Sequence, residues 1–347
     1  MPSKAIHRDS IPGIIGLKNV GATCYMNSTL QCFSNVERLK KYLLKEETYK
    51  DLEKNQDIKK ISFALAEVLK NLWKILNHRF YAPENFKKVI SEENDLFKGI
   101  AANDPKDLIL FILEQINKEL NNPNNSININ NNFVNGHNFV YVYNAFMKDF
   151  NNKNKSIISD EFYGIYYSET TCGNCKTVIY NVQSYDILFF PIEEVRKFMN
   201  YNHNNVRIIE CFKYYQKYEM YSSFRCNSCG LDCYGYQQTR LLKAPKTIIL
   251  NLNRGKGLQY NVKIIFEEYL NLSNYIMDRS SPYYYELTGI ICHFGTNDMG
   301  GHFVAFCKNC NNGEWYKYND QFVTKSSFNE VSQSGLPYVL FYSYIQA

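Results

Sequence analysis

Apolar residues in the first third of the chain recur with the period of an α-helix. Between Asp57 and Asn77 they fall three or four positions apart, as on an amphipathic helix, and Asp57 suits the N-cap. A second helix is expected from Pro83, because proline suits the first turn. A third is expected from Pro105 to Leu120, with Asp104 as its N-cap. The first third is therefore predicted to be mainly helical.

After about residue 160 the pattern changes to short runs of Val, Ile, Tyr and Phe between turn residues. Such runs are typical of the strands of a largely antiparallel sheet. They cover residues 178–182, 187–191, 247–252, 284–292, 303–307, 315–318 and 339–344. A helical part followed by a strand-rich part predicts an α+β fold.

Two segments fall outside this pattern. Residues 121–138 are rich in Asn and low in complexity. Asn favours turns over helix interiors, so we predict an exposed insertion there. Residues 1–12 are polar and are expected to form an N-terminal tail.

Composition narrows the class of protein. The chain has 347 residues, of which 45% are hydrophobic and 21% charged, as in ordinary globular proteins. It has no run of about 18 apolar residues and no apolar signal region at its start, so we expect neither a membrane span nor secretion. The expected location is the cytoplasm, the nucleus or both. The net charge of +5 is small and spread out, which gives no positive case for nucleic-acid binding.

Cysteine usage points to chemistry. The chain holds 11 cysteines, an odd number, and is expected to reside where thiols stay reduced. Disulfide frameworks belong to short secreted chains. A metal site or a catalytic thiol is therefore the better interpretation.

The first candidate motif surrounds Cys24. Gly16 and Gly21 permit tight turns, and Thr23 can cap a helix whose first turn holds Cys24. The positive end of the helix dipole would lower the pKa of this thiol and favour the thiolate. Asn19 could direct an amide N–H at a developing oxyanion. The alternative is that Cys24 is a buried structural cysteine.

The second candidate motif surrounds His302, which follows two glycines and begins an apolar run. Asn319 and Asp320 end the next aromatic strand, and either could orient the imidazole. A thiol, an imidazole and a group that orients it form the set used by cysteine proteases. His302 could instead be structural. His293 is a rival base, but its place inside a strand run favours packing near the cleft.

The third candidate motif is a metal site. Cys172 and Cys175 form one CxxC pair, and Cys226 and Cys229 form another about fifty residues later. Four thiolates around tetrahedral Zn²⁺ make a closed structural site, which leaves no position open for zinc catalysis. Cys233 is close enough to be a spare ligand. The cysteines at 307 and 310 have no second pair nearby, so we interpret that pair as incidental.

Together these motifs resemble the ubiquitin-specific protease family of deubiquitinases. The family's cysteine box looks like GLxNxGxTCYMNSxLQ, and Gly16–Gln31 fits it without a gap. Its histidine box looks like GHYxAY followed by W-x-x-[FY]-[ND]-D, which Gly301–Phe306 and Trp315–Asp320 resemble. Asn103–Leu108 is similar to the family's QDAxEF helix start. The likeness runs from about residue 13 to 345.

The resemblance implies an α+β fold with a papain-like cysteine protease core. It would consist of a helical thumb, an antiparallel β palm and β fingers that carry the zinc. The catalytic domain would cover residues 13–346, with the thumb at about 13–150, the fingers at about 165–245 and the palm at about 246–346. The fingers would hold the globular body of ubiquitin, and the cleft between thumb and palm would accept its C-terminal tail.

The resemblance also implies roles for single residues. Cys24 would be the nucleophile, His302 the general base and Asn319 the residue that orients the imidazole. Asn19 would be the oxyanion donor, and Asp320 would give support.

Asp104, Gly300 and Gly301 would bind substrate. Asp104 matches a family carboxylate that contacts the basic tail, although a plain helix N-cap is the competing interpretation. Gly300 and Gly301 would allow a close backbone approach. Asn103 and Phe303 depart from the usual glutamine and tyrosine, which affects expected tail contacts rather than the reaction.

The implied function is a thiol-dependent deubiquitinase. It would hydrolyse the isopeptide or peptide bond after the C-terminal glycine of ubiquitin through an acyl-enzyme, with structural Zn²⁺ as cofactor. Expected partners are ubiquitin, ubiquitinated proteins and a targeting partner, with no nucleic acid and no membrane; we expect a monomer. Three alternatives stay open: action on a ubiquitin-like modifier, a non-catalytic ubiquitin-binding scaffold, and a zinc-dependent nucleic-acid module.

Overall fold

The computed structural model describes residues 11–74, 79–121, 136–199, 205–255, 261–280, 282–297 and 300–345. Most of the expected insertion at 121–138 and of the expected tail at 1–12 lies outside these ranges. Among the described residues, no helix has the length and apolar character needed to cross a membrane.

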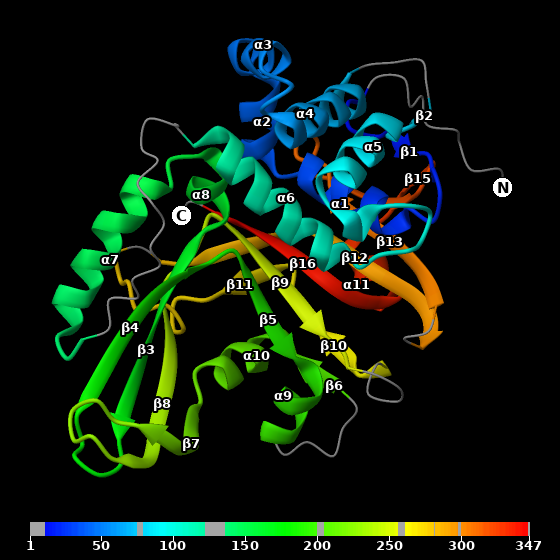
Figure 1. The fold of residues 1–347 in the computed structure, drawn as a ribbon. Helices are drawn as coiled ribbons and strands as arrows, with labels where there is room; N and C mark the ends of the chain where they lie inside the picture. The colour runs from blue at the N-terminus through cyan, green and yellow to red at the C-terminus, as the bar shows by residue number, and fades with distance from the viewer. Residues whose placement is uncertain are drawn as a thin grey trace.

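The N-terminal part is mainly helical, as the apolar pattern predicts. Its elements are β1 (Gly16–Leu17), α1 (Cys24–Ser34), α2 (Glu37–Leu44), α3 (Glu46–Lys54), α4 (Lys60–Trp73), β2 (Phe80–Tyr81), α5 (Glu84–Glu93), η2 (Asp95–Phe97), α6 (Pro105–Leu120), α7 (Phe139–Lys153) and α8 (Ile157–Phe162). Figure 1 shows α1 to α6 gathered at one end of the molecule, where they form the thumb.

The start of α6 follows its local sequence. Asp104 is its N-cap, and the carboxylate accepts the backbone N–H of Lys106 at 2.9 Å. Pro105 occupies the first helical position, where its missing N–H costs nothing. The prediction for this helix is confirmed.

The start of α4 does not follow its local sequence. The helix begins at Lys60, and Asp57 lies in the turn before it. The carboxylate of Glu119, on α6, accepts the backbone N–H groups of Ile61 and Ser62 at 2.9 and 2.7 Å. Because a distant carboxylate satisfies the free N–H groups of the first turn, no local cap is needed. The predicted N-cap at Asp57 is therefore wrong.

The palm is an eight-stranded sheet at the centre of the molecule (Figure 1). Its strands are β5 (Ile187–Pro191), β9 (Thr247–Asn253), β11 (Tyr269–Asn271), β12 (Tyr284–Asn297), β13 (Gly300–Lys308), β14 (Trp315–Asn319), β15 (Phe322–Lys325) and β16 (Leu336–Tyr344). The order is β15-β14-β13-β12-β16-β9-β5, with β11 paired to β12. All pairs are antiparallel except β5 with β9. Each strand run predicted for these segments is confirmed.

Each face of the palm sheet packs on its own core. On the thumb face, Phe33 of α1 contacts Phe341 of β16 with ring centroids 5.8 Å apart. On the other face, Phe190 of β5 contacts Phe212 at 5.2 Å. The elements near that face are α9 (Ile192–Phe198), β6 (Asn205–Arg207), α10 (Ile208–Tyr215), β10 (Lys263–Ile265) and α11 (Phe328–Gln333). Helix α1 is thereby held directly against the central strands.

A second sheet forms an arm that projects from the palm (Figure 1). Its strands are β3 (Gly164–Cys172), β4 (Val178–Tyr185), β7 (Tyr218–Arg225) and β8 (Asp232–Lys243), in the antiparallel order β4-β3-β8-β7. Helix α7 covers part of one face, with Phe139 and Tyr167 rings 5.0 Å apart. The range expected for the fingers, 165–245, also contains β5 and α10, which pair and pack with the palm.

Candidate active site

Cys24 is the first residue of α1, after a turn that its sequence dictates. Gly21 has φ +122° and Ala22 has φ +48°, in the region that favours glycine. Thr23 occupies the N-cap position, but its side chain makes no capping bond. Its hydroxyl instead accepts the backbone N–H of Val20 at 3.0 Å. The helix therefore starts at Cys24 as expected, without the expected side-chain cap.

The Cys24 thiol is buried, with 7% of the residue exposed. Burial raises its pKa, because the thiolate loses solvation. Backbone N–H groups of Phe303, Tyr25 and Cys24 oppose this and lower the pKa, while the charge of Asp320 raises it. The net direction is upward, contrary to the expectation from the helix dipole alone. In this conformation the thiol holds its proton at neutral pH.

His302 lies on β13, a strand that packs against α1. Its Nε2 is 2.7 Å from Oδ1 of Asn319, at the end of the neighbouring strand β14. The strand that carries His302 packs against α1, the helix that begins with Cys24. The fold thus brings together the ends of the two motifs and pairs the imidazole with Asn319.

Asp320 links the two motifs. Its carboxylate accepts hydrogen bonds from Nδ2 of Asn27, at 2.7 Å, and from Nδ2 of Asn19, at 3.0 Å. Its backbone carbonyl accepts the N–H of Leu17 at 2.9 Å. Nε2 of His302 lies 3.9 Å from the same carboxylate. Asp320 has φ +49°, so the chain turns sharply at this point to reach the N-terminal segment.

Asn27 belongs to this network and was not singled out from the sequence. Besides Asp320, its amide donates to the backbone carbonyls of Leu17 and Lys18 at 3.2 and 3.3 Å. The side chain is buried, with 2% of the residue exposed. Asn is unfavourable inside a helix, so its place in the middle of α1 was the signal for a tertiary role.

Asn19 is held on both sides of its amide. Oδ1 accepts the backbone N–H groups of Gly21 and Thr23 at 3.2 and 3.0 Å, while Nδ2 donates to Asp320. The side chain therefore lies in a fixed orientation close to Cys24. Its role as oxyanion donor stays a prediction.

His293 lies beneath the segment that leads to His302. Its ring packs 5.0 Å from that of Phe303, and the residue is 6% exposed. Burial lowers its pKa, and the charge of Arg254 lowers it further. A Cβ on Gly301 would meet Nε2 of His293 at 2.1 Å, whereas a Cβ on Gly300 would meet nothing within 4 Å. Gly301 is therefore needed for packing, and only Gly300 faces open space.

The sequence offers two interpretations of Asp104, a helix N-cap and a carboxylate that binds a cation, and the structure is consistent with both. It is the N-cap of α6, and its carboxylate also pairs with Nζ of Lys106 at 2.8 Å. The hydroxyl of Tyr338 donates to the same carboxylate. The Tyr338 ring packs 5.6 Å from Phe303. Tyr338 was not expected, because only strand pairing brings β16 beside the start of α6.

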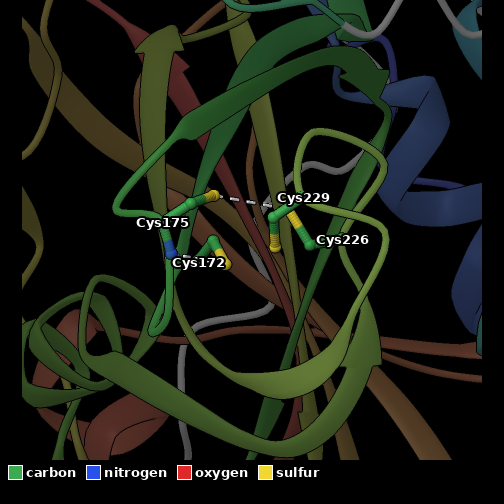
Figure 2. A group of neighbouring side chains, drawn as sticks. All are labelled: Cys172, Cys175, Cys226 and Cys229. Atoms are coloured by element: carbon green, nitrogen blue, oxygen red, sulfur yellow. Dashed lines mark hydrogen bonds between the residues drawn. The ribbon is translucent and has the colours of Figure 1, made fainter.

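The four cysteines of the two CxxC pairs meet at the tip of the fingers. Figure 2 shows their side chains pointing toward one another from the ends of β3 and β7. Their sulfurs all lie within 4.8 Å of one another. Thiolates around one tetrahedral Zn²⁺ lie about 3.8 Å apart, given bonds of about 2.3 Å, so the donor set fits. The residues are Cys172, Cys175, Cys226 and Cys229.

The other cysteines do not extend this group. Cys233 has its sulfur 3.3 Å from that of Cys172 but lies outside the four. Cys310 is 2.9 Å from Nζ of Lys40. Among the described residues, the four fingertip cysteines are the only set of Cys, His, Asp and Glu with the spacing of a metal site.

Comparison with known proteins supplies the family. The sequence model of the family described as Ubiquitin carboxyl-terminal hydrolase matches residues 15–342. The chain belongs to this family. Among curated relatives, human ubiquitin carboxyl-terminal hydrolase 2 is 26% identical over 355 residues, which cover 96% of this chain and 55% of the relative. Mouse ubiquitin carboxyl-terminal hydrolase 4 is 30% identical over 184 residues, 52% of this chain and 19% of that one. The chain thus spans about half the length of the first of these relatives.

Solved structures of this family share the fold. One similar chain comes from the SAGA DUB module Ubp8/Sgf11/Sus1/Sgf73 bound to ubiquitin aldehyde, with TM-score 0.72, 24% identity and coverage of 98% of this chain and 71% of that chain. Another comes from that module bound to monoubiquitin, with TM-score 0.71, 23% identity and coverage of 97% and 70%. The expected α+β fold with thumb, palm and fingers is confirmed.

Proposed function

We propose that this member of the ubiquitin carboxyl-terminal hydrolase family is a thiol-dependent deubiquitinase. One observation carries the proposal: Nε2 of His302 is paired with Asn319, and β13, which carries His302, packs against α1, which begins with Cys24. A nucleophile, a base and a group that orients the base are thereby assembled at one place. A binding scaffold would not need this arrangement.

The reaction begins with proton transfer from Cys24 to His302. Because the pKa of Cys24 is raised, the thiolate forms only as the imidazole takes the proton during attack. Asn319 holds Nε2, which leaves Nδ1 of His302 for this exchange. The sulfur bonds to the carbonyl carbon of the last glycine of ubiquitin. The carbonyl electron pair moves to oxygen and forms the oxyanion.

Collapse of the tetrahedral intermediate breaks the bond to the lysine amine. His302 returns the proton to that nitrogen, which leaves a thioester between Cys24 and ubiquitin. His302 then takes a proton from water, the hydroxide attacks the thioester, and Cys24 leaves as thiol after recovering the proton. Ubiquitin is released with a free carboxylate.

We assign the stabilisation of the oxyanion to the backbone N–H groups at the start of α1 and to the side chain of Asn19. The backbone N–H groups of Cys24 and Tyr25 lie at the start of α1 and lower the pKa of the thiol, and the oxyanion forms next to that thiol. An amide nitrogen carries two N–H groups, and that of Asn19 uses one of them for Asp320. The second is available to the oxyanion. Asp320 is thus a positioning residue that fixes Asn19.

We further propose that the four fingertip cysteines hold a structural Zn²⁺. The ion, when bound, supplies a fixed crosslink between the ends of β3 and β7. Four thiolates leave no position for substrate, so the site has no direct part in hydrolysis. Ubiquitin as substrate, a targeting partner, a monomeric state and a cytoplasmic or nuclear location all stay predictions.

Intact-mass analysis tests the proposed function. The protein is mixed with ubiquitin that bears a thiol-reactive warhead at its C-terminus, beside the variants Cys24→Ala and Cys310→Ala. Cys310 is the matched control, since it is partly exposed and lies outside the site. Wild type and Cys310→Ala should gain the mass of one ubiquitin, and Cys24→Ala should gain none.

Other outcomes would contradict the proposal. Equal labelling of Cys24→Ala would place the nucleophile elsewhere. The absence of labelling in a folded, metal-loaded sample would contradict ubiquitin hydrolysis, and labelling by a ubiquitin-like probe alone would indicate a different modifier.

A further inference from the structure

The carboxylate expected to receive the substrate tail is already paired with a cation of its own chain. Nζ of Lys106 lies 2.8 Å from Asp104 and 3.6 Å from the carboxylate of Asp107. All three side chains are partly exposed, at 34%, 26% and 36% for Lys106, Asp104 and Asp107. The pair therefore stands at the surface, where a substrate can reach it.

The position of Asp104 connects this pair to the catalytic elements. Tyr338 donates its hydroxyl to Asp104 and packs against Phe303, the residue after His302. The neighbouring Asn103 donates to the hydroxyl of Tyr25, 3.4 Å away, and Tyr25 follows Cys24. Asp104 thus lies on the thumb side, linked through Tyr338 and Asn103 to residues that neighbour His302 and Cys24 in the sequence.

The carboxylate of Asp104 has little capacity left for a substrate. An ionised carboxylate offers about four acceptor positions. The backbone N–H of Lys106 occupies Oδ1, while Nζ of Lys106 and the hydroxyl of Tyr338 both occupy Oδ2. Two of these three donors do not depend on the Lys106 side chain. Only the ammonium group neutralises the negative charge.

From this geometry we infer that Lys106 is a specificity-determining residue, which competes with a basic residue of the substrate tail for Asp104. The inference rests on the proposed function, because it presumes a tail that carries positive charge. A tail cation must displace the Lys106 ammonium or share the carboxylate with it. Lys106 therefore weakens tail binding and makes it selective for a tail cation that can make a bidentate pair, as guanidinium does.

The substitution Lys106→Gln tests the inference. Gln keeps most of the side-chain length and the backbone N–H that bonds Asp104, but removes the charge. KM for ubiquitin with a fluorogenic C-terminal group should fall about twofold to fivefold, the range that partly exposed ion pairs carry. The value of kcat should not change, because Lys106 touches no reacting atom and acts on substrate binding alone. The fall should shrink at high salt.

Three controls separate this effect from a structural one. Lys106→Arg keeps the charge and can itself make a bidentate pair with Asp104, so KM should stay at the wild-type value or rise. Lys118 lies on the same helix and pairs with Glu114 on the surface, with Nζ 2.6 Å from the carboxylate. Lys118→Gln should leave KM unchanged. A ubiquitin variant with a neutral residue in place of the tail cation should show the same KM with wild type and Lys106→Gln.

The outcomes distinguish this inference from the proposed function. Cleavage with an equal or higher KM in Lys106→Gln overturns the inference alone. So does an equal fall of KM on the natural and the neutral tail, since that would mean no competition for charge. If neither protein cleaves or binds ubiquitin, the proposed function fails and the inference fails with it.

Discussion

The active site and the fingertip cysteine group are built in opposite ways. Around Cys24 the active-site residues come from α1, the turn before it, the palm strands β13 and β14 and the turn after β14, and a packed core lies behind them. At the fingertip, two short turns each bring two thiols together, and β7 beside them is almost wholly exposed. The first site is held by burial and hydrogen bonds. The second has little apolar surface to bury.

This difference indicates what each site requires in order to be ordered. Asp320 and Asn27 connect residues that are about 300 positions apart, so the active site depends on the complete thumb and palm. The cysteine group, if it holds the proposed ion, needs only the hairpin ends and the attraction of that ion for four thiolates. We therefore expect metal loss to disturb the fingertip and leave the active site assembled.

The largest expected effect is the loss of local folding free energy at the fingertip when the proposed metal ion is removed. Structural zinc sites contribute about 10–16 kcal/mol of apparent free energy to local folding. Adding a chelator should remove hydrogen-exchange protection from residues 172–177 and 225–232, while α1 and β13 keep theirs. Cys226→Ser should lose the metal, whereas Cys233→Ser should retain one ion per chain, because Cys233 lies outside the group. Loss of protection throughout the chain would contradict the comparison.

The second-largest effect is expected from removing Asn319, the residue proposed to orient His302. Asn319→Ala should lower kcat/KM by about 10²- to 10⁴-fold, because His302 loses its fixed orientation. Metal content and protection of the fingers should stay unchanged. The control is Asn312→Ala, on the same β13–β14 hairpin, whose amide bonds Tyr316 at 3.0 Å away from the site. Similar losses in both variants would mean that the hairpin, not the imidazole contact, is responsible.

The pH dependence of Cys24 alkylation should give a smaller effect. Because burial raises the pKa of Cys24, its thiolate fraction at a given pH is lower than that of free cysteine. The rate with a neutral alkylating agent should therefore keep rising to a higher pH, and each tenfold loss of thiolate at pH 7 corresponds to a pKa that is higher by about 1. Mass spectrometry of the Cys24 peptide gives the midpoint. A midpoint below that of free cysteine would indicate a resting ion pair with His302 instead.

The smallest expected effect concerns Asn27. Asn27→Ala removes the bonds to Asp320, Leu17 and Lys18, which should lower the free energy of unfolding by about 1–3 kcal/mol. It should also lower kcat/KM, since Asp320 loses a partner. Asn35→Ala removes another buried amide near α1, bonded to Gln31 at 3.0 Å. That control should lose similar stability in denaturant titrations but keep its kcat/KM.

Sequence-based prediction succeeds for helices that are capped by their own residues and for strands that show a clear run of apolar residues. Asp104 and Pro105 specify the start of α6 by themselves, since an N-cap acceptor and a proline act within one turn. The start of α4 could not be predicted in this way, because Glu119 supplies the cap from another helix. The parallel pairing of β5 with β9 also depends on a contact between distant segments.

The same limit applies to the candidate site. Cys24 and His302 stand in motifs that single them out, and the cysteine pairs predict their own cluster. Asn27, Tyr338 and Lys106 carry no comparable local signal, because their importance comes from what the fold places opposite them.

The features that follow from the order of residues are therefore short-range: helix and strand periods, turns, the N-cap at Asp104, and the residue types of the proposed nucleophile, base and metal ligands. Two further properties arise only in the folded chain: burial outweighs the helix N-terminus at Cys24, and Asp104 is already paired with Lys106. The physical reason is that pKa and charge neutralisation depend on solvation and distance in space. Neither quantity follows from the order of residues until the chain has folded.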